Sequence, residues 1–301
     1  MQPYMDLFGR TFPSYSVMAF LGCLAAFGFI LWVCPKYRAS RNDALYLIAF
    51  VLMFTVLGAK LLYQLGHLSE LWIYRDIIFA SPKSFLDYLG AGFVFYGGLM
   101  GGAAGVMVYA RFFRQNTVAL AESFVPGIPL FHCFGRLGCF MAGCCYGVAW
   151  DGPLTVTFTE SLAAPNGVGL LPIQLIESGA NVINFIVLVV FDIIRRKRYR
   201  ANGGKLVSEK SVGGKYIYRP LQNLGLYLIL YGTQRFVFEF FRGDLIRGVF
   251  LGLSTSQWIS LFLLPVGIWL MLVKPEKNWL AVRALNGRLP EGQIGTKCGG
   301  T

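Results

Sequence analysis

Two arginines and a glutamate share one strongly apolar segment, LYLILYGTQRFVFEFFRGD. Tyr231, Arg235, Glu239 and Arg242 are spaced four, four and three residues apart, which predicts that they lie along one face of a helix. An ion pair between helices beside a second arginine would explain them without any function. The excess of positive charge nevertheless favours binding of an anion, and the planar guanidinium group suits phosphate.

A third arginine belongs to the stretch GRLGCFMAGCCYG, which also holds three cysteines. Because Arg136 would favour ionisation of a nearby thiol, a nucleophilic cysteine that carries a group transiently is one interpretation. A disulfide is another, in which Cys139 pairs with Cys144, or either of them with Cys133. The interpretation we favour is that these thiols pack as small apolar side chains and shape a pocket.

A metal, haem or redox site is a further alternative, because His132 and Cys133 precede these cysteines and thiolates suit soft metals. The spacing HC-x5-C-x4-CC lacks the paired C-x2-C pattern of common zinc sites. His132 and Cys133 would also point in different directions from a helix. The adjacent Cys144 and Cys145 are poorly placed for a mutual disulfide. We therefore expect no bound metal and no cofactor.

Two more apolar segments carry polar residues near one end. GAKLLY contains Lys60, and PIQLIES contains Gln174 and Glu177 after Pro172, a residue that suits the start of a helix. Charged groups inside membrane spans are costly and are functional hypotheses by default. Together with Arg136 and the arginine segment above, they predict one cationic, partly buried pocket at a single depth.

A glycine-rich segment, GAGFVFYGGLMGGAAG, has small residues at the spacing that lets membrane helices pack closely. Tyr96 precedes Gly97 and Gly98 and is expected at the depth of the pocket. Its position by itself fits an ordinary interfacial tyrosine.

The elements that position these residues are predicted to be membrane helices. The chain has 301 residues, of which 55% are hydrophobic and 14% are charged, against about 25% charged in soluble domains. The sequence predicts an all-α integral membrane protein with seven transmembrane helices, each near the ~20 residues that span a bilayer. The first is longer than a signal-peptide core and is expected to be retained. The seven apolar runs are residues 14–34, 45–65, 91–110, 118–135, 171–194, 221–241 and 256–273.

Basic residues are concentrated in alternate connecting segments. Residues 36–44, 111–117, 195–220 and 274–301 hold 19 of the 27 lysines and arginines, whereas the segments on the other side hold five. By the positive-inside rule the N-terminus is outside and the C-terminus is cytoplasmic. The net charge of +12 therefore reflects topology and contact with anionic lipid rather than nucleic-acid binding.

We expect a single transmembrane domain over residues 1–273 and a polar cytoplasmic tail over 274–301. Outer loop 66–90 is predicted to form a helix or two in the membrane interface. Outer loop 141–170 contains TVTFT, which favours a short strand or hairpin. Residues 195–220 are predicted to form a basic cytoplasmic loop.

The chain resembles the prolipoprotein diacylglyceryl transferase family in a set of motifs and in their order. The motifs are GRLGCFMAGCCYG, YGGLMGG, PIQLIE and YGTQRFVFEFFR, with weaker support from GAKLLY. The resemblance implies a seven-helix enzyme of the bacterial plasma (inner) membrane, acting as a monomer. It implies transfer of a diacylglyceryl group from phosphatidylglycerol to the lipobox cysteine of a prolipoprotein signal peptide, releasing glycerol phosphate.

The resemblance also implies roles for individual residues. The predicted catalytic residues are Arg136, Arg235, Glu239 and Tyr96. Arginines would hold the phosphate as the glycerol C–O bond breaks, and Glu239 would orient Arg235. The substrate-binding set predicted from the pocket and the resemblance comprises Arg136, Tyr231, Arg242, Lys60, Gln174, Glu177, Gly97, Gly98, Cys139 and Cys144.

The chain departs from the family pattern at four polar positions. Tyr96 stands where the motif commonly has the histidine proposed as the base, and a tyrosine, with a reference pKa near 10, is a poor base at neutral pH. Cys139, Ala142 and Cys144 replace two asparagines and a glutamate. A paralogue with another acceptor is therefore one alternative. A lipid transporter is another, although such proteins usually show repeats or broken helices near the midplane.

Overall fold

The computed structural model describes residues 2–37, 40–90, 92, 94–113, 117–201, 221–243 and 249–273. The described residues form two compact units, one over residues 2–33 with 118–273 and one over residues 34–117. Among the described residues, five helices are long and apolar enough to cross a membrane, and they confirm a mostly helical integral membrane protein. These five are Ser14–Lys36, Arg41–Gly66, Ala121–Ala142, Ile173–Lys197 and Thr255–Leu272.

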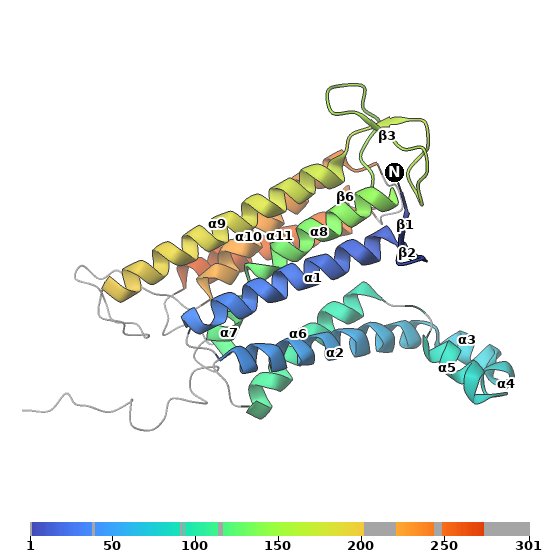
Figure 1. The fold of residues 1–301 in the computed structure, drawn as a ribbon, viewed down its shortest axis with the longest axis horizontal. Coiled ribbons are helices and arrows are strands. Elements are labelled where there is room, and N and C mark those ends of the chain that lie inside the picture. The colour runs from blue at the N-terminus through green and yellow to red at the C-terminus, as the bar shows by residue number, and fades with distance from the viewer. Residues whose placement is uncertain are drawn as a thin grey trace, which may run out of the picture. The chain divides into compact units, whose positions relative to one another are not determined.

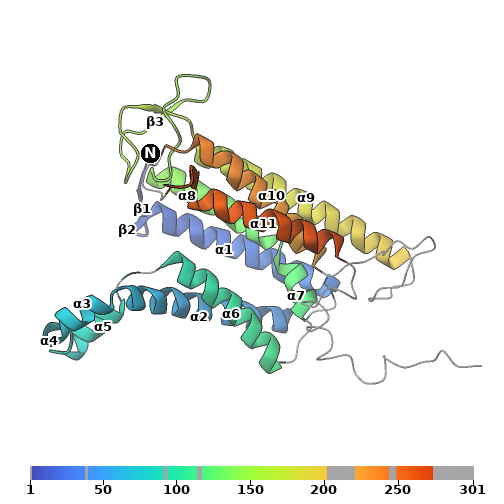
Figure 2. The ribbon, with the colours of Figure 1, turned by 180° about the vertical axis from the view of Figure 1, so that it is seen from behind.

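Five long helices of the first unit pack side by side (Figure 1 and Figure 2). They are α1 (Ser14–Val33), α8 (Gly127–Ala142), α9 (Ile173–Ala201), α10 (Gln222–Phe238) and α11 (Thr255–Leu272). In this order, each packs against the next. Small residues allow the close approach: a Cβ atom on Gly225 of α10 would lie 2.9 Å from the carbonyl oxygen of Gly267 in α11.

Two helices replace the single helix expected over residues 118–135. α7 (Thr117–Phe124) ends before Pro126, which has no N–H to continue a helix, and α8 then runs to Ala142. Gly143 ends α8 in the left-handed conformation, with φ 66°, as is common at helix C-termini. The predicted end at residue 135 is therefore wrong, and Arg136 lies within the helix rather than at its boundary.

A buried ion-pair network joins α7 to α9. Arg195 donates from Nη1 and Nη2 to the two carboxylate oxygens of Glu122, at 3.2 and 2.5 Å. Asp192 accepts from Arg195 at 3.4 Å and pairs with Arg196 at 2.6 Å. Both arginines belong to the last turns of α9, although the sequence placed them in the basic loop. The rest of that loop, 202–220, lies outside the described residues.

Short strands and turns surround one end of the first unit. β1 (Tyr4–Leu7) pairs with β2 (Arg10–Pro13), β3 (Val156–Thr157) with β4 (Gly169–Leu170), and β5 (Val249–Phe250) with β6 (Leu253–Ser254), all antiparallel. The strand expected in TVTFT is thus confirmed. A 3-10 helix, η2 (Glu239–Phe241), continues α10.

The second unit is built on two long helices, α2 (Arg41–Gly66) and α6 (Phe95–Phe113). Three short helices connect them, α3 (Leu68–Ile73), α4 (Arg75–Ile78) and α5 (Pro82–Gly90), and a 3-10 turn, η1 (Cys34–Tyr37), precedes them. Residues 66–90 are helical as predicted, with three short helices in place of the expected one or two, and their position in the membrane interface remains a prediction. Gly58 of α2 faces Gly97 and Gly101 of α6 so closely that a Cβ atom on Gly58 would collide with both, which confirms the packing interpretation of the glycines.

Each of the seven predicted spans contains a helix. α6 and α10 occupy the two that fall outside the five candidate spans. The count of seven membrane crossings and the orientation of the termini remain predictions. The tail from residue 274 onward lies outside the described residues.

Candidate functional site

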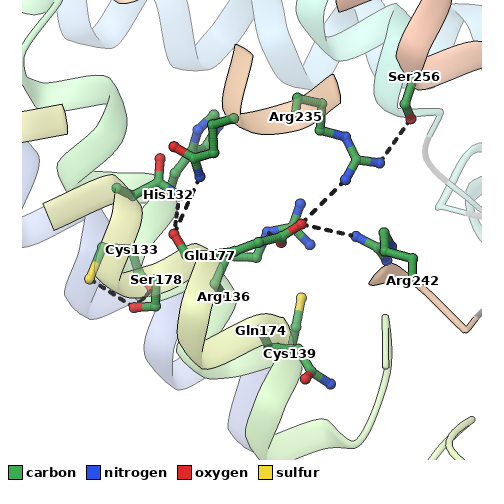
Figure 3. A network of polar contacts seen from close by, with 12 residues as sticks. His132, Cys133, Arg136, Cys139, Gln174, Glu177, Ser178, Arg235, Arg242 and Ser256 are labelled. Atoms are coloured by element: carbon green, nitrogen blue, oxygen red, sulfur yellow. Dashed lines mark hydrogen bonds and ion pairs between the residues drawn. The ribbon is translucent and has the colours of Figure 1, made fainter. Parts of the chain in front are cut away.

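Three arginines converge on the carboxylate of Glu177, in the second turn of α9 (Figure 3). Nε of Arg136 lies 2.6 Å from Oε2, and the Nη1 atoms of Arg235 and Arg242 lie 3.4 and 3.6 Å from Oε1. The side chains of Glu177 and Arg242 are 3% and 2% exposed. Because burial excludes water, these charges interact more strongly than surface ion pairs do. Glu177 therefore holds the positive charges of three arginines together.

Arg235 is held by three elements. It pairs through Nη2 with Glu239 of η2 at 2.7 Å and donates from the same atom to Oγ of Ser256, near the start of α11, at 2.8 Å. With its bond to Glu177, these contacts fix both ends of the guanidinium fork. Ser254 caps α11 in a capping box with Gln257, so the position of Ser256 is set by the start of that helix.

Positive charges outnumber negative ones among the described residues of this cluster. Arg136, Arg235 and Arg242 carry three positive charges, and Glu177 and Glu239 carry two negative ones. Guanidinium groups gathered in this way favour a bound anion. Guanidinium groups hold phosphate oxygens through paired hydrogen bonds.

The arginine segment does not follow the predicted single helical face. α10 ends at Phe238, Glu239 belongs to the 3-10 turn, and Arg242 is extended, with φ −88° and ψ 136°. That part of the prediction is wrong, because the chain must leave the helix to pair with another loop: Arg242 forms a β-bridge with Gly147. Arg242 still reaches Glu177, by a different route.

Tyr231 belongs to a neighbouring group of rings. Its ring lies 5.5 Å from that of His132 and 5.7 Å from that of Tyr227, whose hydroxyl lies 3.4 Å from Nδ1 of His132. Cys133 contacts the hydroxyl of Ser178, at 3.1 Å. As expected, His132 and Cys133 point to different partners (Figure 3).

The other cysteines of the GRLGCFMAGCCYG stretch come together. The Sγ atoms of Cys139, Cys144 and Cys145 all lie within 4.8 Å of one another. Gln174, fully buried, donates from Nε2 to the carbonyl oxygen of Cys144 at 2.9 Å, which ties the cysteine loop to the first turn of α9. Hydrogen bonds from the other two thiols, with Arg242 nearby, lower the pKa of the Cys145 thiol.

The remaining predicted residues belong to the second unit. Lys60 lies in α2, and Gly97 and Gly98 lie in α6, where both pack against α2. Tyr96 is the second residue of α6, and its side chain lies outside the described part of the chain. The first unit alone thus brings together Arg136, Glu177, Arg235, Glu239 and Arg242, with Gln174 behind them.

Sequence reasoning missed three contributors. Ser256 and Gln234 are ordinary polar residues without motif spacing, yet Ser256 binds Arg235 and Gln234 donates to the carbonyl oxygen of Glu177 at 3.4 Å. Cys145 was considered only as a ligand in the metal alternative and was not among the predicted site residues. Its φ of 54° turns its side chain back toward Cys139, and no local sequence pattern signals that conformation.

The fold and site define a mostly helical membrane protein with a buried arginine–carboxylate cluster that suits a phosphate group. Comparison with known families gives the same result. The model of the family described as prolipoprotein diacylglyceryl transferase matches residues 4–273, and this chain belongs to that family.

Curated relatives match over most of their length. A phosphatidylglycerol–prolipoprotein diacylglyceryl transferase of Clostridium tetani is 35% identical, over 89% of this chain and 96% of the relative. One of Clostridium perfringens, numbered 2, is 32% identical over 91% and 95%. One of Dehalococcoides mccartyi is 28% identical over 88% and 90%.

Proposed function

We propose that this protein transfers the diacylglyceryl group of phosphatidylglycerol to the lipobox cysteine thiol of a prolipoprotein, releasing glycerol phosphate. The convergence of three arginines on the buried carboxylate of Glu177 carries this proposal, because guanidinium groups suit phosphate. The phosphodiester of phosphatidylglycerol supplies such a group. The relatives' names, which specify the same donor and acceptor, support the assignment.

Arg136, Arg235 and Arg242 bind the phosphate and stabilise the charge that develops on it as the C–O bond of the glycerol carbon breaks. Glu177 positions the three guanidinium groups, and Glu239 orients Arg235. Gln174 and Cys144 fix the loop beside them, and Cys139 lines the same pocket. Because the ion pairs already hold these groups in place, little reorganisation is needed during the reaction.

The motifs shared with the family support a catalytic role for Tyr96 and substrate-binding roles for Tyr231, Lys60, Gly97 and Gly98. An unperturbed tyrosine is a weak base near neutral pH, so another source of thiol activation is required.

The enzyme is proposed to act as a monomer in the bacterial inner membrane, with seven spans, the N-terminus outside and the C-terminus cytoplasmic. The transmembrane domain covers residues 1–273, and 274–301 form the tail. The excess of basic residues in alternate connecting segments supports this topology. It puts the arginine cluster at the outer leaflet, where secreted prolipoproteins emerge.

The test is transfer in a strain depleted of its own transferase, with lipidation of a reporter prolipoprotein read by mass spectrometry. Arg136→Ala and Arg235→Ala are each expected to lower transfer by about 100-fold or more. Arg75→Ala is the control, because that arginine is 56% exposed and pairs with its neighbour Asp76. Near-normal lipidation in both site variants would overturn the assignment.

A further inference from the structure

Three thiols lie close together at the end of α8, one from the helix and two from the loop that follows it. Cys139 is buried in the last turn of the helix, whereas Cys144 and Cys145 follow the turn at Gly143 and are half-buried. All three Sγ atoms lie within 4.8 Å of one another. In a tetrahedral zinc site with Zn–S bonds of about 2.3 Å, the sulfur atoms are about 3.8 Å apart. The cluster therefore already has nearly the spacing of a three-thiolate metal site.

The backbone that brings the thiols together is specific. Gly143 has φ +66°, and a Cβ atom there would collide with Ser161. The amide of Cys144 donates to the carbonyl oxygen of Cys139 at 3.0 Å, and Cys145 has φ 54°. A cysteine in the left-handed region is strained, and such strain is concentrated at functional sites. Packing of small apolar side chains gives no reason for that conformation.

Neighbouring cations suit a thiolate cluster. Arg136 lies one turn before Cys139 on α8, and both Cys139 and Cys145 act electrostatically on it. Arg242 acts on Cys145 in the same way. Three thiolates around Zn²⁺ carry one net negative charge, which these arginines compensate. Binding the ion would replace the weak contact from the Cys144 thiol to the carbonyl oxygen of Cys139, at 3.7 Å.

We propose that Cys139, Cys144 and Cys145 bind a zinc ion, and that its open fourth position receives the acceptor cysteine as a thiolate. Zinc sites with three protein ligands keep such a position for water or substrate. A thiol that coordinates a metal ion is deprotonated outright. This inference rests on the proposed function. The sequence spacing led us to expect no bound metal, because the C-x2-C pattern is missing. The three thiols nevertheless lie close together in the folded chain, which favours a metal site.

The step is balanced without any oxidant. The acceptor S–H loses its proton to water as its sulfur binds zinc. A sulfur lone pair then forms a C–S bond to the carbon of the acylated glycerol that is bonded to the phosphate oxygen, and the C–O bond at that carbon breaks. The electron pair of the broken bond leaves with glycerol phosphate, whose charge the arginines stabilise. Zinc thus supplies the thiol activation for which Tyr96 is poorly suited.

Metal content is the first measurement. The full chain, purified in detergent under reducing conditions and incubated with Zn²⁺, is expected to retain about one zinc ion per chain after gel filtration. Zinc affinity should fall in each of the variants Cys139→Ser, Cys144→Ser and Cys145→Ser. Loss of a residue that only hydrogen-bonds to a metal ligand typically lowers metal affinity about 10- to 100-fold, and loss of a ligand itself should lower it further. Replacement of zinc by Co²⁺ should give thiolate-to-cobalt charge-transfer absorption that the same variants lose.

Cys133→Ser is the matched control. Cys133 is buried like Cys139, but it contacts Ser178, and a serine hydroxyl can keep that contact. It should bind zinc and Co²⁺ as the unmodified chain does. Absence of zinc and of the cobalt absorption from the unmodified chain, or their retention when all three cysteines are replaced, would overturn the zinc site. A disulfide within the cluster that resists reduction and excludes zinc would do the same.

Transfer assays separate this inference from the proposed function. Removing zinc with a chelator should lower transfer to the acceptor by about 100-fold, as expected for loss of thiol activation, and leave binding of phosphatidylglycerol unchanged. If the zinc-free protein transfers at the full rate, the role of zinc is overturned and the proposed function stands. If the zinc-loaded protein binds phosphatidylglycerol without transferring it, the proposed function fails, and the acceptor role fails with it.

Discussion

Arg136 and Glu177 form an ion pair between α8 and α9 in which Nε lies 2.6 Å from Oε2. The two residues are 41 positions apart in the sequence, and each also belongs to a motif of its own. Glu177 accepts contacts from Arg235 and Arg242 as well. The carboxylate thus acts as the common partner that holds three like charges together before any substrate binds.

Replacing Glu177 by glutamine should therefore damage both the fold and the reaction. Three guanidinium groups would lose their shared anion, and breaking a buried pair costs about 3–5 kcal/mol. Phosphatidylglycerol binding and transfer per folded molecule should fall by at least about tenfold. Glu122→Gln is the matched control, because it breaks the buried pair with Arg195, away from the site.

Thermal unfolding in detergent and transfer per folded molecule, measured on both variants, check this prediction. Both should unfold at a lower temperature, and only Glu177→Gln should lose activity per folded molecule. Equal activity losses would mean that Glu177 is merely structural.

Ser256→Ala should weaken transfer without unfolding the protein. The hydroxyl accepts a hydrogen bond from Arg235 at 2.8 Å, and a hydrogen bond to a charged group contributes about 1.5–3 kcal/mol. A fall in kcat/KM of about tenfold or more is expected. Ser260→Ala is the control, since that hydroxyl donates to the carbonyl oxygen of Ser256 within α11. Steady-state kinetics with similar values for the two variants would argue against a positioning role for Ser256.

Tyr96 can be tested by two substitutions with opposite expectations. Tyr96→Phe removes the hydroxyl and should impair transfer, whereas Tyr96→His restores the residue common in the family motif and should keep it. Initial rates of reporter lipidation give the comparison. If phenylalanine is harmless, the tyrosine serves packing alone.

Gly58→Ala should destabilise the pair formed by α2 and α6. Its added Cβ would meet the backbone of Gly97 and Gly101, with Cα of Gly101 at 2.8 Å. Overpacking of this kind typically costs about 1–3 kcal/mol. Gly28→Ala in α1 is the control, because nothing lies within 4 Å of the added atom. An unchanged unfolding temperature for Gly58→Ala would show that the two helices separate easily.

Hydrophobic runs were sufficient to predict helices at all seven expected positions, and intramembrane charges identified Arg136, Glu177 and Arg235 as neighbours. Both signals are local, since they depend on length, apolarity and the cost of burying a charge. The end of α8 was misplaced because Pro126 divides the fourth run and Gly143, rather than the first polar residue, ends the helix.

The rest depended on backbone geometry that no periodic pattern contains. Arg242 leaves its helix through a 3-10 turn, and Cys145 adopts a left-handed conformation. Ser256 reaches Arg235 because α11 begins beside α10. In each case the contact depends on the path of a loop. Residue spacing within one segment does not predict that path.

The β-bridge between Gly147 and Arg242 joins the loop of the proposed zinc site to the arginine cluster. The amide of Gly243 donates to the carbonyl oxygen of Tyr146 at 3.0 Å, and that of Val148 to Phe241 at 3.0 Å. The loop that carries the thiols and the strand-like segment that carries the last arginine therefore shift together or not at all. Binding of the donor lipid would consequently be coupled to binding of the acceptor peptide through the backbone. By linkage, each should change the affinity for the other by the same factor.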